Sequence, residues 1–209
     1  MQLYKYKSLS NFEFVADILL NKRLFASDFN NLNDPMEGDF NRDYTSSEYS
    51  KIITDEMRKI KICSLSSNMN NPILWAHYAD GFKGICIEVE IDESILTPHK
   101  ITYSGFNPIP SEEDRGLYGI DEKMTPSDWA IVALKSKNEA WQYEDEYRLF
   151  SDAKHISKGL TITAIYFGTR MSEVYKGLIH KLLSGEIEKK ETIILDSNMV
   201  IPVIEFRIN

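Results

Sequence analysis

The residues best suited to chemistry lie in the segment 141–149, which places several carboxylates beside a guanidinium. Its centre reads Glu144-Asp145-Glu146-Tyr147-Arg148. We expect a strand here, on which side chains alternate, so that Glu144, Glu146 and Arg148 share one face. Two carboxylates about 7 Å apart on a strand could act on one substrate, one steadying a developing positive charge while the other orients a nucleophile. Arg148 would then hold Glu146 ionised. The same spacing also fits a solvated strand face with a ladder of salt bridges.

A second candidate is the aromatic segment Trp75-Ala76-His77-Tyr78. Pro72 opens a short helix that puts Trp75 and Tyr78 three residues apart on one face. A flat ring there could stack on a planar ligand such as nicotinamide or adenine, whereas Trp75 could equally fill the core. His77 could be a base or a metal ligand, but a scattered histidine is more often a structural hydrogen-bonding residue.

Two further segments carry polar groups that a ligand could use. Asn33-Asp34-Pro35 forms a turn through side-chain hydrogen bonds and the restriction that proline imposes, and a turn alone explains it. Lys5 lies on the predicted first strand between Tyr4 and Tyr6. A lysine there is usually on a solvated face, but it could also bind a phosphate or pyrophosphate.

The elements that must position these residues predict a mixed α+β fold in a single domain spanning residues 1–209. Strands outnumber helices and do not alternate strictly with them, which disfavours a doubly wound sheet. Residues 105–124 lack periodicity and predict a long loop or lid. The predicted strands are 3–7, 24–27, 61–66, 84–91, 99–103, 144–150 and 160–167, followed by a hairpin over 191–208. The predicted helices start near residues 11, 46, 72, 128 and 173.

Composition limits the function classes. The 209 residues are 43% hydrophobic and carry a formal net charge of −8, which disfavours general binding to nucleic acid or to a membrane surface. Cys63 and Cys86 each lie in an apolar run, so we expect buried hydrophobic residues and no zinc site. There is no signal-peptide core at the start and no apolar run near the roughly 20 residues of a membrane helix. We therefore expect a cytoplasmic protein with no membrane partner.

Five motifs occur in the order that characterises one family. The chain resembles a bacterial and phage family named domain of unknown function 2971, and the resemblance runs from about Leu3 to about Leu183. The motifs are Leu3-Tyr4-Lys5-Tyr6, Leu32-Asn33-Asp34-Pro35, Trp75-Ala76-His77-Tyr78-Ala79, Trp141-x-Tyr143-Glu144-x-Glu146-Tyr147-Arg148 and Ile165-Tyr166-Phe167-Gly168.

The chain also resembles the ADP-ribosyltransferase fold, and this second resemblance implies a function. It rests on the order of an early strand with a basic residue, a middle segment with an aromatic residue, and a late Glu-x-Glu. The resemblance implies a mixed or antiparallel split sheet, with flanking helices, that binds NAD as a substrate. It assigns the catalytic glutamate to Glu146, the accessory acceptor-activating glutamate to Glu144 and the stacking ring to Tyr78. Lys5 stands where histidine or arginine is usual, and a lysine cannot offer a bidentate fork.

The resulting prediction is an NAD-dependent ADP-ribosyltransferase-like protein of a phage-defence or toxin system, with transfer ahead of plain NAD hydrolysis. The acceptor would be a protein or a nucleic acid, and an antitoxin protein is a candidate partner. Two alternatives stay open: a non-catalytic binding or regulatory module, and a nucleic-acid-processing enzyme that uses a divalent metal. No metal is expected for the ADP-ribosyltransferase-like protein or for the binding module. The residues expected to contact NAD are Lys5, Tyr6, Asn33, Asp34, Trp75, His77, Tyr78 and Arg148.

Overall fold

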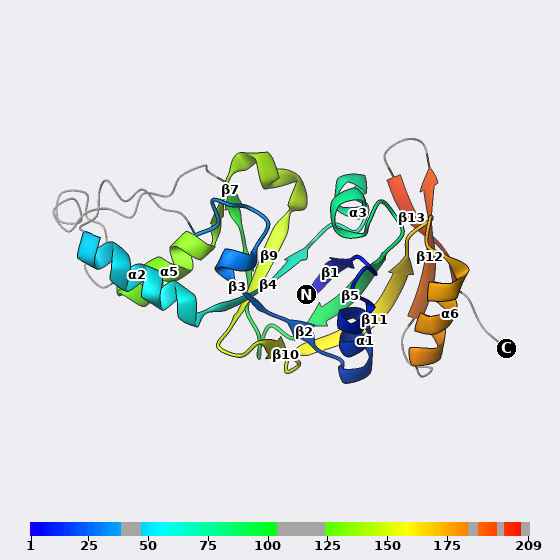
Figure 1. Cartoon of the computed structure of the whole chain (residues 1–209), viewed down its shortest axis with the longest axis horizontal. Helices are drawn as coiled ribbons and strands as arrows, with labels where there is room; N and C mark the ends of the chain where they lie inside the picture. The colour runs from blue at the N-terminus through cyan, green and yellow to red at the C-terminus, as the bar shows by residue number, and fades with distance from the viewer. Residues whose placement is uncertain (39–46, 104–123, 184–187, 196–198, 206–209) are drawn as a thin grey trace.

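A large mixed sheet forms the centre of the protein (Figure 1). The computed structural model describes residues 1–38, 47–103, 124–183, 188–195 and 199–205. Within these residues nine strands form the sheet, and all neighbours are antiparallel except the β11–β12 pair. The strands, in spatial order, are β13 (Met199–Glu205), β12 (Glu188–Leu195), β11 (Leu160–Phe167), β5 (Ile85–Ile91), β1 (Gln2–Lys7), β4 (Lys61–Ser66), β9 (Glu146–Ser151) and β6 (Pro98–Lys100), with β3 (Ser27–Asp28) paired to β4.

Two short strand pairs and a set of helices complete the described part of the chain. β2 (Leu24–Phe25) pairs with β10 (His155–Ile156), and β7 (Thr102–Tyr103) pairs in parallel with β8 (Ser136–Lys137). The α-helices are α1 (Phe12–Asn21), α2 (Ser47–Lys59), α3 (Pro72–Tyr78), α5 (Pro126–Leu134) and α6 (Glu173–Leu182), and the 3-10 helices are η1 (Phe29–Asn31) and η3 (Glu139–Glu144).

The sheet is split between β1 and β4. β1 pairs with β5 at every one of its residues, whereas it pairs with β4 only where Tyr4 faces Ser66. The two strands therefore diverge toward Lys7, and the side chains on both faces of β1 become accessible along the gap. Figure 1 shows β4 and β9 turning away from the block formed by β1, β5 and β11.

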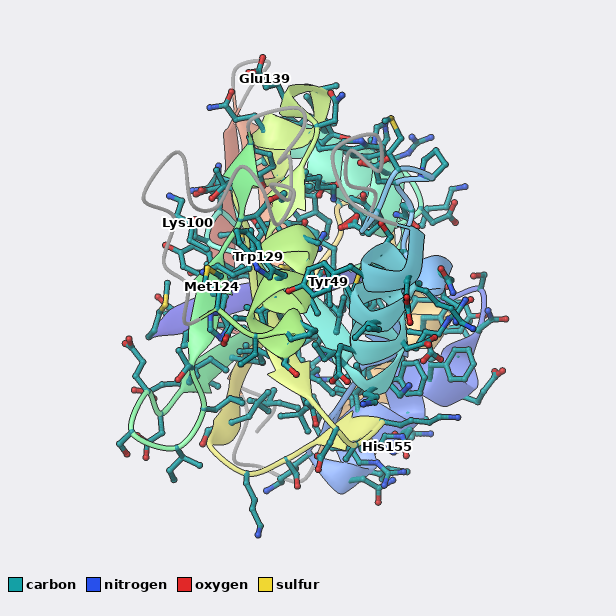
Figure 2. The ribbon with its side chains drawn as sticks, turned by 90° about the vertical axis from the view of Figure 1, so that its left-hand side faces the viewer. Tyr49, Lys100, Met124, Trp129, Glu139 and His155 are labelled. Atoms are coloured by element: carbon teal, nitrogen blue, oxygen red, sulfur yellow. The ribbon has the colours of Figure 1, made fainter. Side chains whose placement is uncertain are left out.

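Helices cover both faces of the sheet. On one face, Leu3 packs in a cluster with Val15 of α1 and Ile179 of α6. On the other face, α3 covers one end of the sheet, where Trp75 packs on Tyr6. α2 and α5 lie side by side at the opposite end (Figure 2). Glu146 and Arg148 lie on the same face as Tyr6, because Glu146 pairs with Ser66 and Ser66 with Tyr4. Lys5 and Lys7 alternate with Tyr6 and lie on the face of Leu3, and the cavity at the split of the sheet is lined by residues from both faces.

The fold confirms the mixed α+β prediction and corrects its details. The predicted strand 144–150 begins at Glu146, because Glu144 ends η3 and Asp145 adopts a left-handed conformation with φ 43°. The helix predicted to start near residue 128 runs from Pro126 to Leu134, since a capping box on Thr125 starts it and β8 follows closely. The C-terminal hairpin is confirmed as the β12–β13 pair.

Other expectations concern the cysteines, the loop and the helices. Cys63 and Cys86 are buried free cysteines, as predicted. The predicted loop 105–124 lies almost entirely outside the described residues. None of the helices in the described ranges combines the length and hydropathy that crossing a bilayer requires.

Candidate functional site

A cavity of about 740 Å³ lies where β1 and β4 diverge. Its volume falls within the range of sites that bind small molecules and cofactors. It collects side chains from β1, the loop after η1, α3, η3 and β9, which lie far apart in the sequence. Of the ten residues predicted for the site, eight line this cavity: Lys5, Tyr6, Asn33, His77, Tyr78, Glu144, Glu146 and Arg148.

Arg148 organises the charged end of the cavity from β9. It is fully buried, and alternation along the strand puts its guanidinium beside Glu146. Nε of Arg148 donates to Oε1 of Glu146 at 2.8 Å, and Nη2 donates to Oε2 at 3.2 Å. Nη1 donates to the carbonyl of Leu134 at 2.6 Å, and the guanidinium also pairs with Glu37. Each side of the guanidinium therefore has a partner, so its position is fixed.

Lys137 of β8 joins the two glutamates of the Glu-x-Glu motif. Its ammonium lies 2.5 Å from Oε2 of Glu144 and 3.0 Å from Oε2 of Glu146. The other oxygen of Glu144 accepts a hydrogen bond from the hydroxyl of Tyr78. Glu144 thus reaches Glu146 from η3, although it does not share the strand. We call Glu37, Lys137, Glu144, Glu146 and Arg148 the carboxylate cluster.

The cluster is buried, so the interpretation of a solvated strand face is wrong. Glu146 is 3% exposed. Burial raises the pKa of the Glu146 carboxyl, but Arg148 and Lys137 outweigh it and lower that pKa to about 2. The prediction that Arg148 holds Glu146 ionised is confirmed. For Lys137, burial lowers the pKa, and Glu146 and Glu144 reverse this and raise it above its usual value. Burial raises the pKa of the third carboxyl, Glu37.

Tyr78 provides the aromatic ring at the charged end. Its half-buried ring lines the cavity, while His77 beside it is exposed. Burial, followed by the hydrogen bond to Glu144, raises the pKa of the Tyr78 hydroxyl, so it acts as a donor. Nδ1 of His77 lies 3.4 Å from the hydroxyl of Tyr143 on η3.

Trp75 does not belong to the site, which corrects the prediction that it contacts a ligand. It is 0% exposed and stacks on Phe82 with ring centroids 5.7 Å apart. Its Nε1 donates to the carbonyl of Met69 at 3.0 Å, so its polar atom is satisfied inside the core. Tyr6 packs edge-on against it and donates its hydroxyl to the carbonyl of Asn68 at 2.7 Å. Tyr6 is therefore a wall of the cavity.

Asp34 also lies outside the cavity, since its side chain builds a turn. Its Oδ1 accepts from the amide of Met36 at 2.9 Å, and its carbonyl accepts from the amide of Glu37 at 3.0 Å. The turn delivers Glu37 to Arg148 on one side and leaves Asn33 in the cavity on the other. Sequence reasoning missed Glu37, although a turn-forming Asn-Asp-Pro ahead of a carboxylate was its signal.

Lys137 was also missed, and it carried no usable sequence signal. It lies on a strand of two residues after a helix, where periodicity is too short to indicate a face. The three carboxylates of the cluster are each paired with Lys137 or Arg148, which would repel a divalent cation. Across the ranges that the structure describes, no group of three metal-ligating side chains comes together.

Comparison with known families gives one match. Residues 74–149 match the family described as "Protein of unknown function (DUF2971)". This segment is similar to the DUF2971 family. The matched DUF2971 segment runs from α3 to β9 and contributes Tyr78, Lys137, Glu144, Glu146 and Arg148, while Glu37 and β1 lie outside it. No curated protein and no solved structure matches the chain.

Proposed function

We propose that this protein is an NAD-dependent ADP-ribosyltransferase-like enzyme. The observation that carries the proposal is the meeting of Lys5, Tyr78 and the Glu144/Glu146 pair in one cavity, at a split in the sheet. These are the positions that the resemblance to the ADP-ribosyltransferase fold assigns to phosphate contact, ring stacking and catalysis. The cavity also has the size of a small-molecule site.

The chemistry follows from the charge of the glutamates. The bond between nicotinamide and ribose breaks, and nicotinamide leaves with the bonding electron pair while positive charge builds on the ribose carbon. An ionised carboxylate beside that carbon stabilises the transition state more than the ground state. Glu146 is ionised at neutral pH. Glu144, held by Tyr78, would orient the acceptor, whose attacking atom forms the new bond and releases its proton.

A non-catalytic binding module is the second candidate, and one observation favours it. Both oxygens of Glu144 and both oxygens of Glu146 already have partners within the protein. Such a carboxylate pair can be purely structural, because buried ion pairs often serve to fix one packing. A metal-dependent nuclease is supported less well, since Lys137 and Arg148 occupy the positions next to the carboxylates where a metal would have to bind.

The test is nicotinamide release from NAD by purified protein, with and without cell extract as a source of protein and nucleic-acid acceptors. We expect turnover by the wild type and a loss on the order of 10²-fold in Glu144→Gln when acceptor is present. Release without acceptor should change less, because Glu144 is assigned to the acceptor. Glu139→Gln is the matched control, because it removes the same charge from the exposed start of the same 3-10 helix (Figure 2).

The binding-module proposal makes the opposite prediction in the same assay. If NAD binds in calorimetry but no nicotinamide appears under any condition, the protein is a binding module. If NAD neither binds nor reacts, both proposals fail for this ligand. Circular dichroism of each variant must first establish that the carboxylate cluster still folds, because Glu144 is buried.

A further inference from the structure

The end of the cavity away from the carboxylate cluster holds a second charged group, the lysines of β1. Lys5 and Lys7 are two residues apart on one strand, so their side chains lie on the same face about 7 Å apart. Both line the cavity. Glu146 is level with Tyr4, because both pair with Ser66. Lys7 is three residues beyond Tyr4, so it lies about 10 Å from Glu146 along the strand direction. We call Lys5 and Lys7 the lysine pair.

The charge of Lys7 is not compensated. Within the described ranges, no carboxylate oxygen lies within 4.0 Å of its ammonium, and no acceptor receives a hydrogen bond from it. The acid on this side of the cavity, Asp17, is already bound by Arg23 at 2.7 and 3.0 Å. Lys5 donates to the carbonyl of Ser64 at 2.7 Å, which leaves it two further donors.

Because Lys7 is partly buried and lies beside Lys5, the absence of a counter-charge disfavours its protonated form. Burial, with a further contribution from the neighbouring charge of Lys5, lowers the pKa of Lys7 to about 8. The thiol of Cys63 also acts on the charge of Lys7, but complete burial raises the pKa of that thiol, so it stays neutral. A half-buried ammonium beside a second one is stabilised only when an anion enters between them.

We propose that Lys5 and Lys7 form a binding subsite for the phosphate or pyrophosphate group of the ligand. Three donors on Lys7 and the two remaining on Lys5 match a group with several anionic oxygens. The two ends of the cavity then differ in charge pairing: Glu144 and Glu146 are paired with Lys137 and Arg148 at one end, whereas Lys7 has no counter-charge among the described residues at the other. This inference rests on the proposed function, because the anionic pyrophosphate of NAD is the group that the lysine pair would bind.

The experiment measures binding of ADP, inorganic pyrophosphate and NAD by calorimetry at pH 8, in two buffers of different ionisation enthalpy. We expect ADP to bind the wild type and to take up about half a proton, because an anion raises the pKa of Lys7 from near the working pH. Lys7→Met should weaken ADP binding about tenfold or more and abolish the proton uptake. Lys7→Arg keeps the charge and should restore most of the affinity without restoring the uptake.

Lys83→Met is the matched control, because Lys83 is an exposed lysine outside the cavity whose nearest acid is Asp80 at 3.8 Å. It should bind ADP with the affinity and proton uptake of the wild type. Each variant is checked by its thermal midpoint, so that a folding defect is not mistaken for lost binding.

The outcomes separate this inference from the proposed function. ADP binding that depends on Lys7, without any release of nicotinamide from NAD, supports the subsite and rejects the enzyme. NAD turnover with ADP affinity unchanged in Lys7→Met rejects the subsite and leaves the enzyme. Pyrophosphate binding as tightly as ADP supports the anion subsite but assigns it to a free phosphate compound and not to a nucleotide. Absence of binding by ADP and pyrophosphate overturns the inference.

Discussion

The carboxylate cluster and the lysine pair differ in how their charges are balanced. At the carboxylate end, Arg148 and Lys137 lie between three glutamates, and each charged group has a partner inside the protein. At the lysine end, Lys7 has none among the described residues. Paired buried charges hold elements together and are costly to break. An unpaired, partly buried charge costs free energy in the folded state, and a bound anion would remove that cost.

Because the carboxylate cluster is fully paired, a mutation at the Glu-x-Glu motif changes stability as well as activity. On an open strand face, Glu146→Gln would leave folding nearly intact and would report on activity alone. In the structure, Glu146 bridges Arg148 and Lys137 within a buried cluster, so its loss leaves two cations short of a partner. Activity lost in that variant would therefore not identify a catalytic role. Glu144 and Lys7 are more informative positions.

The largest expected effect tests whether the carboxylate cluster is structural. Arg148→Met should lower the free energy of unfolding by about 3–5 kcal/mol, because it leaves Glu37 and Glu146 buried without their shared cation. Urea unfolding followed by circular dichroism measures this. Arg58→Met is the control: its pair with Asp55 is exposed on α2, and we expect a change within about 0.5 kcal/mol. If both variants lost the same free energy of unfolding, the buried cluster would be no more important to stability than an exposed ion pair, and the prediction would be wrong.

The next effect is acid sensitivity of the same cluster. The pKa of Glu146 is about 2 in the folded protein, against an ordinary value of 4.5. Its ionisation therefore stabilises the fold above pH 4.5, and this contribution is lost as the pH falls through 2. The full contribution is about 3 kcal/mol, at about 1.4 kcal/mol for each tenfold change. Carbon-13 NMR titration of the Glu146 carboxyl measures the pKa directly, and a value near 4.5 would contradict the ion pairing.

The smallest change in the free energy of unfolding is expected at the lysine pair, and there the substitution should stabilise and not destabilise the fold. Lys7→Met should leave the free energy of unfolding unchanged or raise it slightly at pH 7, because it removes an uncompensated charge. The pKa of Lys7 is lower in the folded protein, so the unfolded chain binds more protons between pH 8 and 10.5. Wild-type stability should therefore rise relative to the variant across that window. Urea unfolding at pH 7 and pH 10 tests this, and a clear loss of stability at pH 7 would mean that Lys7 has a structural partner.

Sequence reasoning recovered most of the fold because local patterns determine most of its elements. β4 occupies the predicted range, and α3 and α6 start at the predicted residues, 72 and 173. The start of β9 was missed, because acidic residues in alternation resemble a strand until the backbone turns at Asp145. The limits of α5 were missed for a similar reason, since the β7–β8 pairing that ends it is a long-range contact.

The candidate site was predictable in its residue types but not in its connections. The sequence alone determined that Lys5, Tyr78, Glu144, Glu146 and Arg148 are the chemically capable residues, because their identities and spacing are local facts. Only the tertiary structure decided that Trp75 is core, and that Glu37 and Lys137 complete the charged end. Ion pairs and burial depend on residues that are brought together across the sheet, and no local pattern carries that information. The uncompensated charge of Lys7 likewise emerged only once the neighbours on every side were known.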